Sequence, residues 1–502
     1  MPSLWLLLAF AGLPLAAQTK PLQHAAATIT ARDLIRHVGI IAHDSMLGRA
    51  TPSVGLEQTA VYVASEFRRA GLEPAGDAGS YLQRFGVTRW SIDNQRSAVE
   101  LRGSGRRGEA RLGADARYVL GKLPDQPLTG PVVLIAGPDT GRVADVDVKD
   151  KIVLLVADFS RSPTAALNQK IVHVARAGPQ AVLVLSNRDS VTFALRLAAA
   201  QRPRLERDAE ADSDRSAPVI ELHERSVGAV LAGAGIEPAR LRALQRVEHR
   251  LISGLQAEIR LTRQVVARAR VPNVVGILEG ADSLLRREYL VYSAHIDHIG
   301  ISPGQPDSIN NGADDNAAGV AGLLELVQAF TEPGVRPRRS VVFFAPGAEE
   351  DGLLGSAHFA EHPTIPLSRI VANINMDLIG RNWPDSVIAV GMEQSDLGKT
   401  LQLTVQAHPE LRMTPIADRW PEERIFYRSD HYNFARKGVP ILFFTSGTHA
   451  DYHQPSDDTD RIDSDKAARL VRLLFYLGSR VADTLPRPRW AAESYRQIVE
   501  RK

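Results

Sequence analysis

Short apolar segments rich in β-branched residues alternate with helical segments from about residue 272 to residue 485. The predicted strands are 289–294, 340–345, 370–376 and 440–444, and the predicted helices are 317–330, about 353–361 and 465–484. Strands and helices in strict alternation indicate a mostly parallel sheet covered by helices. We therefore predict an α/β fold whose mixed, mostly parallel central sheet is flanked by helices.

A different pattern occupies residues 95–265. Before it, residues 31–69 follow a helical period and residues 81–90 alternate as a strand does. Within it, the chain has three apolar runs and one helical stretch, namely strands at 131–136, 152–157 and 181–185 and a helix at 165–177. The charged stretch 203–216 has the composition of an exposed loop. We predict a small β-rich or α/β domain inserted into the main domain.

The first residues have the features of an export signal. Residues 1–17 carry no charge, and the apolar run 4–15 is too short to span a bilayer. Small residues, Ala16 and Ala17, follow it, as at a signal-peptide cleavage site. The first lysine is Lys20, so the usual basic leading region is missing, and a buried N-terminal helix is the alternative. We predict an exported protein, periplasmic or extracellular, with no integral membrane segment after signal removal.

The predicted order of segments follows from these patterns. It is a signal peptide at 1–17, the N-terminal part of the main domain at 18–94, the inserted domain at 95–265, the catalytic part of the main domain at 266–485 and a C-terminal tail at 486–502. The tail is rich in Pro and Arg. Disorder, a docking helix and a contact with a partner all stay open for it.

Composition restricts the possible chemistry. The chain has 60 Lys and Arg residues against 58 Asp and Glu residues, so its charge gives no case for a nucleic-acid partner. It has no cysteine, which excludes disulfides, thiolate catalysis and sulfur-ligated metals. A metal site in this chain must be built from His, Asp and Glu.

Imidazoles and carboxylates follow the predicted strands of the main domain. They are His295 and Asp297, Asp315 at the start of a helix, Glu349 and Glu350, Asp377, and His453. Loops at the carboxyl ends of parallel strands converge, so these side chains are expected to meet. Paired divalent cations use such ligands to activate water and polarise a carbonyl group. Of two adjacent glutamates, one can serve as ligand and the other as base.

Several neighbouring residues have structural interpretations instead. His298, His358 and His431 are each interpreted as structural histidines, and Asp314 fits a helix cap as well as a ligand. Residues 300–304 match the G-x-S-x-G pattern of serine hydrolases, but the sequel has loop composition rather than a helical period. The chain has no H-E-x-x-H motif, which disfavours a single-zinc protease of the helical type.

The motifs in their order resemble those of the dinuclear-zinc aminopeptidases. They are His295-x-Asp297, Gly312-Ala-Asp-Asp315-Asn316, Glu349-Glu350-x-Gly352, Asn375-Met-Asp377 and Tyr452-His453-x-Pro455-x-Asp457. The resemblance covers about 30–90 and 270–485, and it includes secreted bacterial leucyl-type aminopeptidases, glutamate carboxypeptidase and glutaminyl cyclase. It implies a fold of the zinc exopeptidase type. The insert resembles a protease-associated domain through residues 147–154, with Asp150 where Gly is commoner.

The resemblance also implies roles for individual residues. His295 and Asp377 would bind one zinc ion, Glu350 and His453 the other, and Asp315 would bridge the two Zn²⁺ ions. Glu349 would be the general base, and Asp297 would accept the second N–H of His295. Tyr452 would donate a hydrogen bond to the oxyanion, Arg428 would line the substrate pocket, and the Asp315–Asn316 peptide bond would be cis.

These roles make hydrolysis of an N-terminal peptide bond the leading hypothesis, with peptides as substrates. Carboxypeptidase, dipeptidase or glutaminyl cyclase activity on the same metal platform is one alternative, and a non-catalytic binding protein is another. The sequence leaves the oligomeric state open.

Overall fold

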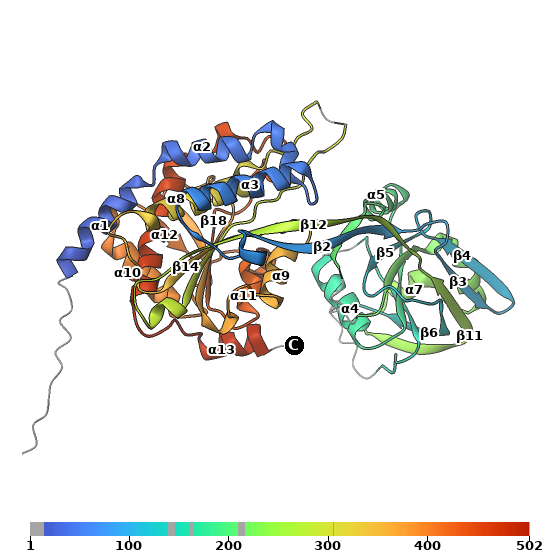
Figure 1. Cartoon of the computed structure of the whole chain (residues 1–502). Coiled ribbons are helices and arrows are strands. Elements are labelled where there is room, and N and C mark those ends of the chain that lie inside the picture. Colours follow the sequence, from blue (N-terminus) through green and yellow to red (C-terminus); the bar gives the residue numbers. More distant parts are fainter. Residues whose placement is uncertain (1–14, 139–145, 161–163, 209–215, 305, 501–502) are drawn as a thin grey trace, which may run out of the picture. The chain divides into compact units, whose positions relative to one another are not determined.

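The computed structural model describes residues 15–138, 146–160, 164–208, 216–304 and 306–500 (Figure 1). The chain forms two compact units, Met1–Gly86 with Ala269–Lys502, and Val87–Arg268. Each unit has hydrophobic clusters of its own. Most of the predicted signal peptide lies outside the described residues, and so it stays a prediction.

The first unit is built on a mixed sheet with the strand order β17-β16-β18-β15-β13-β14-β12, continued by β2 and with β1 paired to β12. The strands are β1 (Glu73–Pro74), β2 (Leu82–Ile92), β12 (Arg263–Leu278), β13 (Tyr289–Ser293), β14 (Ser340–Ala345), β15 (Ile370–Met376), β16 (Ser386–Val390), β17 (Thr414–Ile416) and β18 (Ile441–Thr445). The central pairs β14–β13, β13–β15 and β15–β18 are parallel, and β12–β14 and β16–β18 are antiparallel. The predicted α/β fold with a mostly parallel mixed sheet is confirmed.

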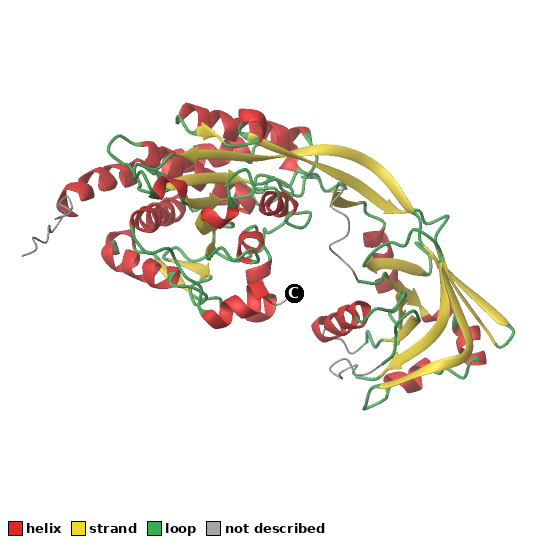
Figure 2. Cartoon of the chain, turned by 60° about the horizontal axis from the view of Figure 1, so that its bottom comes forward, coloured by secondary structure: helices red, strands yellow, loops and turns green. Residues whose placement is uncertain are grey.

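Both faces of this sheet are covered by helices (Figure 2). The helices of the unit are α1 (Leu15–Thr28), α2 (Ala31–Ile41), α3 (Val54–Arg69), α8 (Gly319–Thr331), α9 (Leu354–Glu361), α10 (Leu397–Ala407), α11 (His431–Ala435), α12 (Ser464–Asp483) and α13 (Ala492–Tyr495). Successive side chains of a strand point to opposite faces. Val291 of β13 packs in a cluster with Phe359 of α9 and Phe434 of α11. The next residue, Tyr292, contacts Phe330 of α8 and donates a hydrogen bond to Leu474 O of α12 at 2.7 Å.

The helical pattern of residues 31–69 is broken into two helices. A turn at Asp44–Arg49 and the following Pro52 separate α2 from α3. Gly48 and Arg49 both have left-handed backbone conformations, with φ of 67° and 52°, so the helix cannot continue through them. Each new helix starts at a capping hydroxyl, Thr30 for α2 and Ser53 for α3.

The second unit has a sheet with the order β4-β3-β11-β6-β7-β8-β10-β5. Its elements are β3 (Ala98–Gly103), β4 (Arg106–Arg111), β5 (Ala116–Leu120), β6 (Leu128–Ala136), β7 (Ile152–Val156), α4 (Thr164–Arg176), β8 (Ala181–Ser186), α5 (Ser190–Ala200), β9 (Arg204–Arg207), β10 (Val219–His223), α6 (Gly228–Gly233), α7 (Pro238–Arg242) and β11 (Glu248–Arg260). The three predicted apolar runs are the parallel strands β6, β7 and β8.

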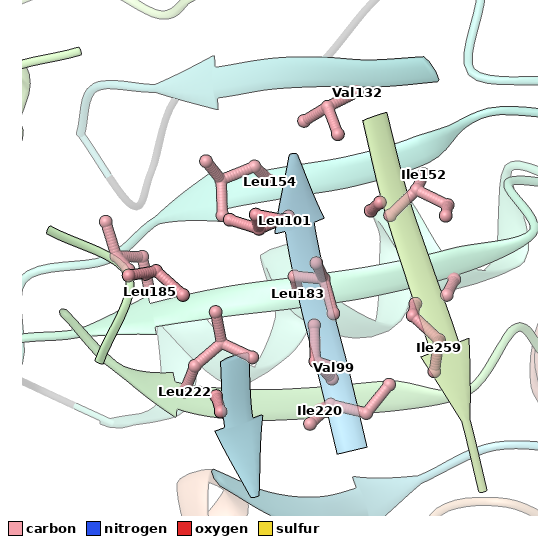
Figure 3. Close-up of a cluster of buried hydrophobic side chains, with 14 of the residues drawn as sticks. Val99, Leu101, Val132, Ile152, Leu154, Leu183, Leu185, Ile220, Leu222 and Ile259 are labelled. Carbon is pink, nitrogen blue, oxygen red and sulfur yellow. The ribbon is translucent and has the colours of Figure 1, made fainter. Parts of the chain in front are cut away.

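Both faces of the parallel strands are buried in this unit. Leu154 and Leu183 lie in a cluster with Val99 of β3 and Ile259 of β11 (Figure 3). On the opposite face, Val153 packs in a cluster with residues of α4. One part of the predicted loop at 203–216 is wrong, because residues Arg204–Arg207 form β9, which pairs with β2. Residues 209–215 of that loop lie outside the described residues.

The described part of the C-terminal tail packs on the first unit. The indole N–H of Trp490 donates to Gly438 O at 2.9 Å, and Trp490 and Ile498 pack against the cluster that contains Phe434. The sequence left disorder, a docking helix and a partner contact open for the tail. Up to residue 500, the tail is docked on the first unit. Among the described residues, no helix is long and apolar enough to cross a membrane.

Glu325 of α8 is a fully buried carboxylate whose ionisation should affect stability. Its Oε2 accepts the N–H of Thr30 at 3.0 Å, while Oε1 has no hydrogen-bond partner among the described residues. Burial raises the pKa of Glu325 to about 7, above its ordinary value of 4.5. The folded state therefore holds this proton more tightly than the unfolded chain, and stability is lost as the pH rises from about 4.5 to about 7.

We expect Glu325→Gln to gain stability relative to the wild type by about 1–3 kcal/mol when the pH is raised from 5 to 8, because glutamine stays neutral. Urea unfolding at both pH values measures this difference. Glu422→Gln is the matched control, since the Glu422 side chain is exposed and its variant should follow the wild type at both pH values. A pH-independent difference for Glu325→Gln would contradict the expectation.

Candidate metal centre

Five side chains predicted as metal ligands meet at the carboxyl ends of the parallel strands. His295 follows β13, Glu350 follows β14, Asp377 follows β15, and His453 lies in the loop after β18. Asp315 precedes α8 and lies in a short irregular turn with a cis Asp315–Asn316 peptide bond, as the family resemblance implied. The topology of the sheet therefore brings together groups that are up to 158 residues apart, from 295 to 453.

The side chains form two groups that share Asp315. In one group, His295 Nε2 lies 3.5 Å from Asp315 Oδ1 and 3.4 Å from Asp377 Oδ1. In the other, His453 Nε2 lies 3.1 Å from both Asp315 Oδ2 and Glu350 Oε2. Each oxygen of Asp315 thus faces a different group. The ligand atoms of each group lie within 4.8 Å of one another, a spacing that one cation could satisfy.

Polar atoms without hydrogen bonds point into this cluster. Among the described residues, Asp377 Oδ1 and His453 Nε2 are buried and make no well-directed hydrogen bond. The other oxygen of Asp377 accepts the hydroxyl of Ser429 at 2.9 Å, which leaves Oδ1 turned toward His295. Buried polar atoms are rarely unpaired, so these atoms fit a cation as the missing partner. Neutral imidazoles and carboxylates are the donors that zinc accepts.

The carboxylates of the cluster repel one another. Burial and the neighbouring charge of Glu350 raise the pKa of Asp315. Burial alone would raise the pKa of Glu350, but the adjacent imidazoles of His298 and His453 outweigh it and hold that pKa well below its ordinary value. Divalent cations among these oxygens would remove the repulsion.

Glu349 belongs to neither group, although it lies beside the group that contains His295. Its side chain is 9% exposed, and Oε2 lies 3.9 Å from His295 Nε2. Burial raises the pKa of Glu349 well above its ordinary value, the His295 charge opposes this, and the charges of Glu350 and Asp377 add to it. A carboxyl group held in this way has a raised affinity for a proton, which suits proton transfer.

The contacts of Asp297 differ from the prediction. His295 Nδ1 lies 3.2 Å from the backbone carbonyl of Asp297, whereas the Asp297 carboxylate is 3.9 Å away. The carboxylate instead accepts the backbone N–H groups of Glu349 and Glu350, at 3.0 and 3.2 Å. The predicted carboxylate–imidazole hydrogen bond is therefore wrong, because the carboxylate is turned toward the two glutamates and fixes their backbone.

A second buried carboxylate also holds the backbone of a ligand segment by accepting its N–H groups. Asp457 accepts the backbone N–H groups of Asp314 and Asp315, each at 3.1 Å. Asp314 itself accepts the N–H of Gly380 at 2.6 Å. The N–H that begins α8, at Gly319, is accepted by the side chain of Asn316 rather than by Asp314. The cap interpretation of Asp314 is therefore wrong, and its carboxylate holds the loop after β15.

His298 is the residue of the cluster for which the sequence predicted a structural role. Its Nδ1 lies 2.8 Å from Glu350 Oε1, and it groups with Asp315, Glu350 and His453. Its position directly after the ligand loop of His295 was the available signal. His431 and His358 lie apart from the two groups: His431 Nε2 lies 2.9 Å from Phe426 O, and His358 stacks on Phe85.

A cavity of about 220 Å³ opens beside Asp377. Its lining residues are Leu378, Asn382, Trp383, Trp420, Glu423, Ile425, Arg428, Phe443, Thr445, Ser446, Gly447, Thr448 and Tyr452. The rings of Trp383 and Trp420 stack with centroids 6.0 Å apart. Tyr452 stacks on His453, and burial together with the nearby carboxylates raises the pKa of its hydroxyl. The half-exposed Arg428 guanidinium lies 4.0 Å from Glu423.

Residues 273–478 match the family model described as peptidase family M28. Aminopeptidase YwaD of Bacillus subtilis is 32% identical over 130 residues, which are 26% of each chain. Leupeptin-inactivating enzyme 1 of Streptomyces exfoliatus is 31% identical over 149 residues, 29% of this chain and 32% of that protein. Mouse aminopeptidase NAALADL1 is 40% identical over 111 residues, 21% of this chain and 13% of that protein.

The chain therefore spans about a third or less of the length of these curated relatives. Among solved structures, an aminopeptidase from Aneurinibacillus sp. strain AM-1 superposes with a TM-score of 0.55 at 17% identity, covering 93% of this chain and 97% of that chain. At that identity the likeness establishes the fold.

Metal binding should stabilise the folded protein, since the unfolded chain has no preformed site. We expect zinc added to chelator-treated protein to raise the Tm, with about 2.7 kcal/mol of stabilisation at a hundredfold excess over Kd. Thermal unfolding followed by circular dichroism measures the shift. Asp315→Asn removes the negative charge of the carboxylate that both ligand groups share, and it should abolish most of the zinc-induced rise in Tm. A zinc-independent Tm would contradict this reading of the centre.

Proposed function

We propose that this protein, whose residues 273–478 match the model of peptidase family M28, is a zinc-dependent aminopeptidase that removes N-terminal residues from peptides. One observation carries the proposal. Two groups of ligand side chains share Asp315, a carboxylate outside both groups, Glu349, lies 3.9 Å from the ligand His295, and a cavity opens beside the ligand Asp377. The names of the relatives YwaD and NAALADL1 support the same activity.

We assign the ligands by group. His295 and Asp377 would hold one zinc ion, Glu350 and His453 would hold the other, and Asp315 would bridge the two. When bound, the zinc pair supplies Lewis-acid polarisation of the scissile carbonyl and lowers the pKa of water. His298 then acts through Glu350, since its Nδ1 hydrogen-bonds to that carboxylate and fixes its orientation.

Glu349 is the proposed general base. It would take a proton from the attacking water and deliver it to the leaving amine. Asp297 supports this role by accepting the backbone N–H of Glu349, so the carboxylate stays beside His295. Tyr452, whose hydroxyl keeps its proton through a raised pKa, would donate a hydrogen bond to the oxyanion.

The cavity would bind the side chain of the N-terminal residue. Trp383, Trp420 and Phe443 give it apolar walls, which favours large apolar side chains, while Arg428 and Glu423 lie in its polar part. Carboxypeptidase, dipeptidase or cyclase chemistry would use the same ligands. Free-amine and N-blocked peptides separate these reactions, because the proposed enzyme hydrolyses only the former.

We further propose that the unit Val87–Arg268 is a protease-associated domain and that the chain is exported by its N-terminal segment. The first proposal rests on the motif at residues 147–154, which runs into β7, and the second on the apolar run 4–15. Neither changes the chemistry assigned to the centre.

Glu349→Gln should lower kcat on leucine p-nitroanilide by about 10²–10⁴, since the amide cannot accept the proton. Metal analysis of the same preparation should show zinc content equal to that of the wild type. The adjacent Glu350→Gln is the matched comparison, and it should lose zinc as well as activity. Wild-type turnover by a zinc-loaded Glu349→Gln enzyme would remove Glu349 from the role of base.

Trp420→Ala should lower kcat/KM for leucine and phenylalanine p-nitroanilides by about 10-fold, because an apolar wall of the cavity is lost. The alanine substrate serves as the internal control, since its methyl group reaches less of that wall and its kcat/KM should change little. Equal losses for all three substrates would argue that this cavity does not bind the N-terminal side chain.

A further inference from the structure

Arg49 is a buried cation whose role the sequence did not reveal. It ends the turn between α2 and α3 and is 1% exposed. Among the described residues, the hydrogen bonds that its guanidinium donates go to backbone carbonyls and not to a carboxylate. A buried arginine normally pairs with a carboxylate, because an uncompensated charge is costly in the interior. The burial of the Arg49 charge without a hydrogen-bonded carboxylate therefore needs an explanation.

Four backbone carbonyls accept its hydrogen bonds. Nε donates to Ile296 O at 3.1 Å, Nη1 donates to Ile41 O at 2.9 Å and Asn311 O at 2.7 Å, and Nη2 donates to Gly312 O at 3.0 Å. Ile296 directly follows the ligand His295, and Gly312 lies three residues before Asp315. One side chain thus connects the loop of His295 with the loop of Asp315.

The backbone around Arg49 docks on the same two loops. Arg49 O accepts the N–H of His298 at 3.2 Å, and Gly48 O accepts the N–H of Gly300 at 2.9 Å. A Cβ atom on Gly48 would lie 2.6 Å from both Asn310 O and Gly300 O. Only glycine permits this close approach of the backbone. Gly48 therefore allows the following residue, Arg49, to place its guanidinium against the ligand loops.

The charge of Arg49 also matches its surroundings. Burial lowers its pKa to about 10, and the carboxylates of Asp315, Asp297, Asp457 and Glu350 oppose that change, so the side chain is charged at neutral pH. A fixed cation in their field offsets part of the repulsion among these carboxylates. Arg49 offsets this repulsion even before any metal is bound.

We propose that Arg49 is a positioning residue of the metal centre, which holds the loops of His295 and Asp315 at the separation that zinc binding requires. The inference rests on the proposed zinc-dependent function. It assigns part of the centre to a segment outside residues 273–478, the stretch that matches the family model.

The test compares Arg49→Lys and Arg49→Met with the wild type in the full chain. Lysine keeps the charge but cannot reach four carbonyls with a planar fork. Zinc affinity is measured on metal-free protein by competition with a chromophoric chelator, and the Tm of the metal-free form is recorded alongside. We expect both variants to bind zinc about 10–100-fold more weakly, as for other residues that orient metal ligands.

Arg339→Lys is the matched control. Arg339 is also fully buried in the same unit and also donates to backbone carbonyls, those of Val481 and Thr484. It pairs in addition with Glu288, and among the described residues it contacts no ligand loop. The Arg339→Lys variant should have a lower Tm in the metal-free form, and its zinc affinity should stay within twofold of that of the wild type. Zinc affinity within twofold of the wild type in Arg49→Lys would overturn the proposal. A wild-type chain that binds no zinc would overturn the proposed function and this inference together.

Hydrogen exchange on the wild type provides a measurement that needs no variant to fold. The segment Ile41–Ala50 contains no proposed ligand, yet Arg49 ties it to both ligand loops by hydrogen bonds to Ile296 O on one and to Asn311 O and Gly312 O on the other. Zinc loading should slow exchange in this segment as well as in the loops. Slower exchange in the loops alone would contradict the proposed coupling.

Discussion

The centre depends on one carboxylate that faces two ways. Asp315 Oδ1 lies beside His295 and Asp315 Oδ2 beside His453, so both groups of ligand atoms are defined by a single side chain. Such sharing brings the other carboxylates close enough to repel one another, and burial strengthens the repulsion. The surrounding structure is therefore organised to hold backbone segments in place: Asp297 fixes the two glutamates, and Asp457 fixes the turn that carries Asp315.

The fold explains why these groups can be distant in sequence. Parallel strands end at the same edge of the sheet, and each of β13, β14, β15 and β18 contributes one loop to the cluster. The strands are buried on both faces, which leaves the loops at their ends as the place for polar chemistry. The helices supply rigidity rather than ligands, and Tyr292 of β13 contacts both α8 and α12.

The sequence predicted those parts that depend on local pattern. Apolar runs located the strands, and the imidazoles and carboxylates that follow them located the cluster. Two kinds of feature were out of reach. The sequence does not tell which groups the side chains of Asp297 and His298 face, because the packing of distant loops decides it. Arg49 binds carbonyls, which every residue carries, and its acceptor at Gly312 is 263 residues away. No periodicity or motif marks a partnership of that kind.

The cluster consists of imidazole nitrogens and carboxylate oxygens, and the whole chain contains no cysteine. None of these donor atoms forms disulfides or is oxidised in steps as a thiolate is. The centre and the fold around it should therefore be indifferent to the redox potential of their surroundings. Thiol-directed reagents would find no target in this protein, and its assembly would need neither an oxidant nor a disulfide isomerase.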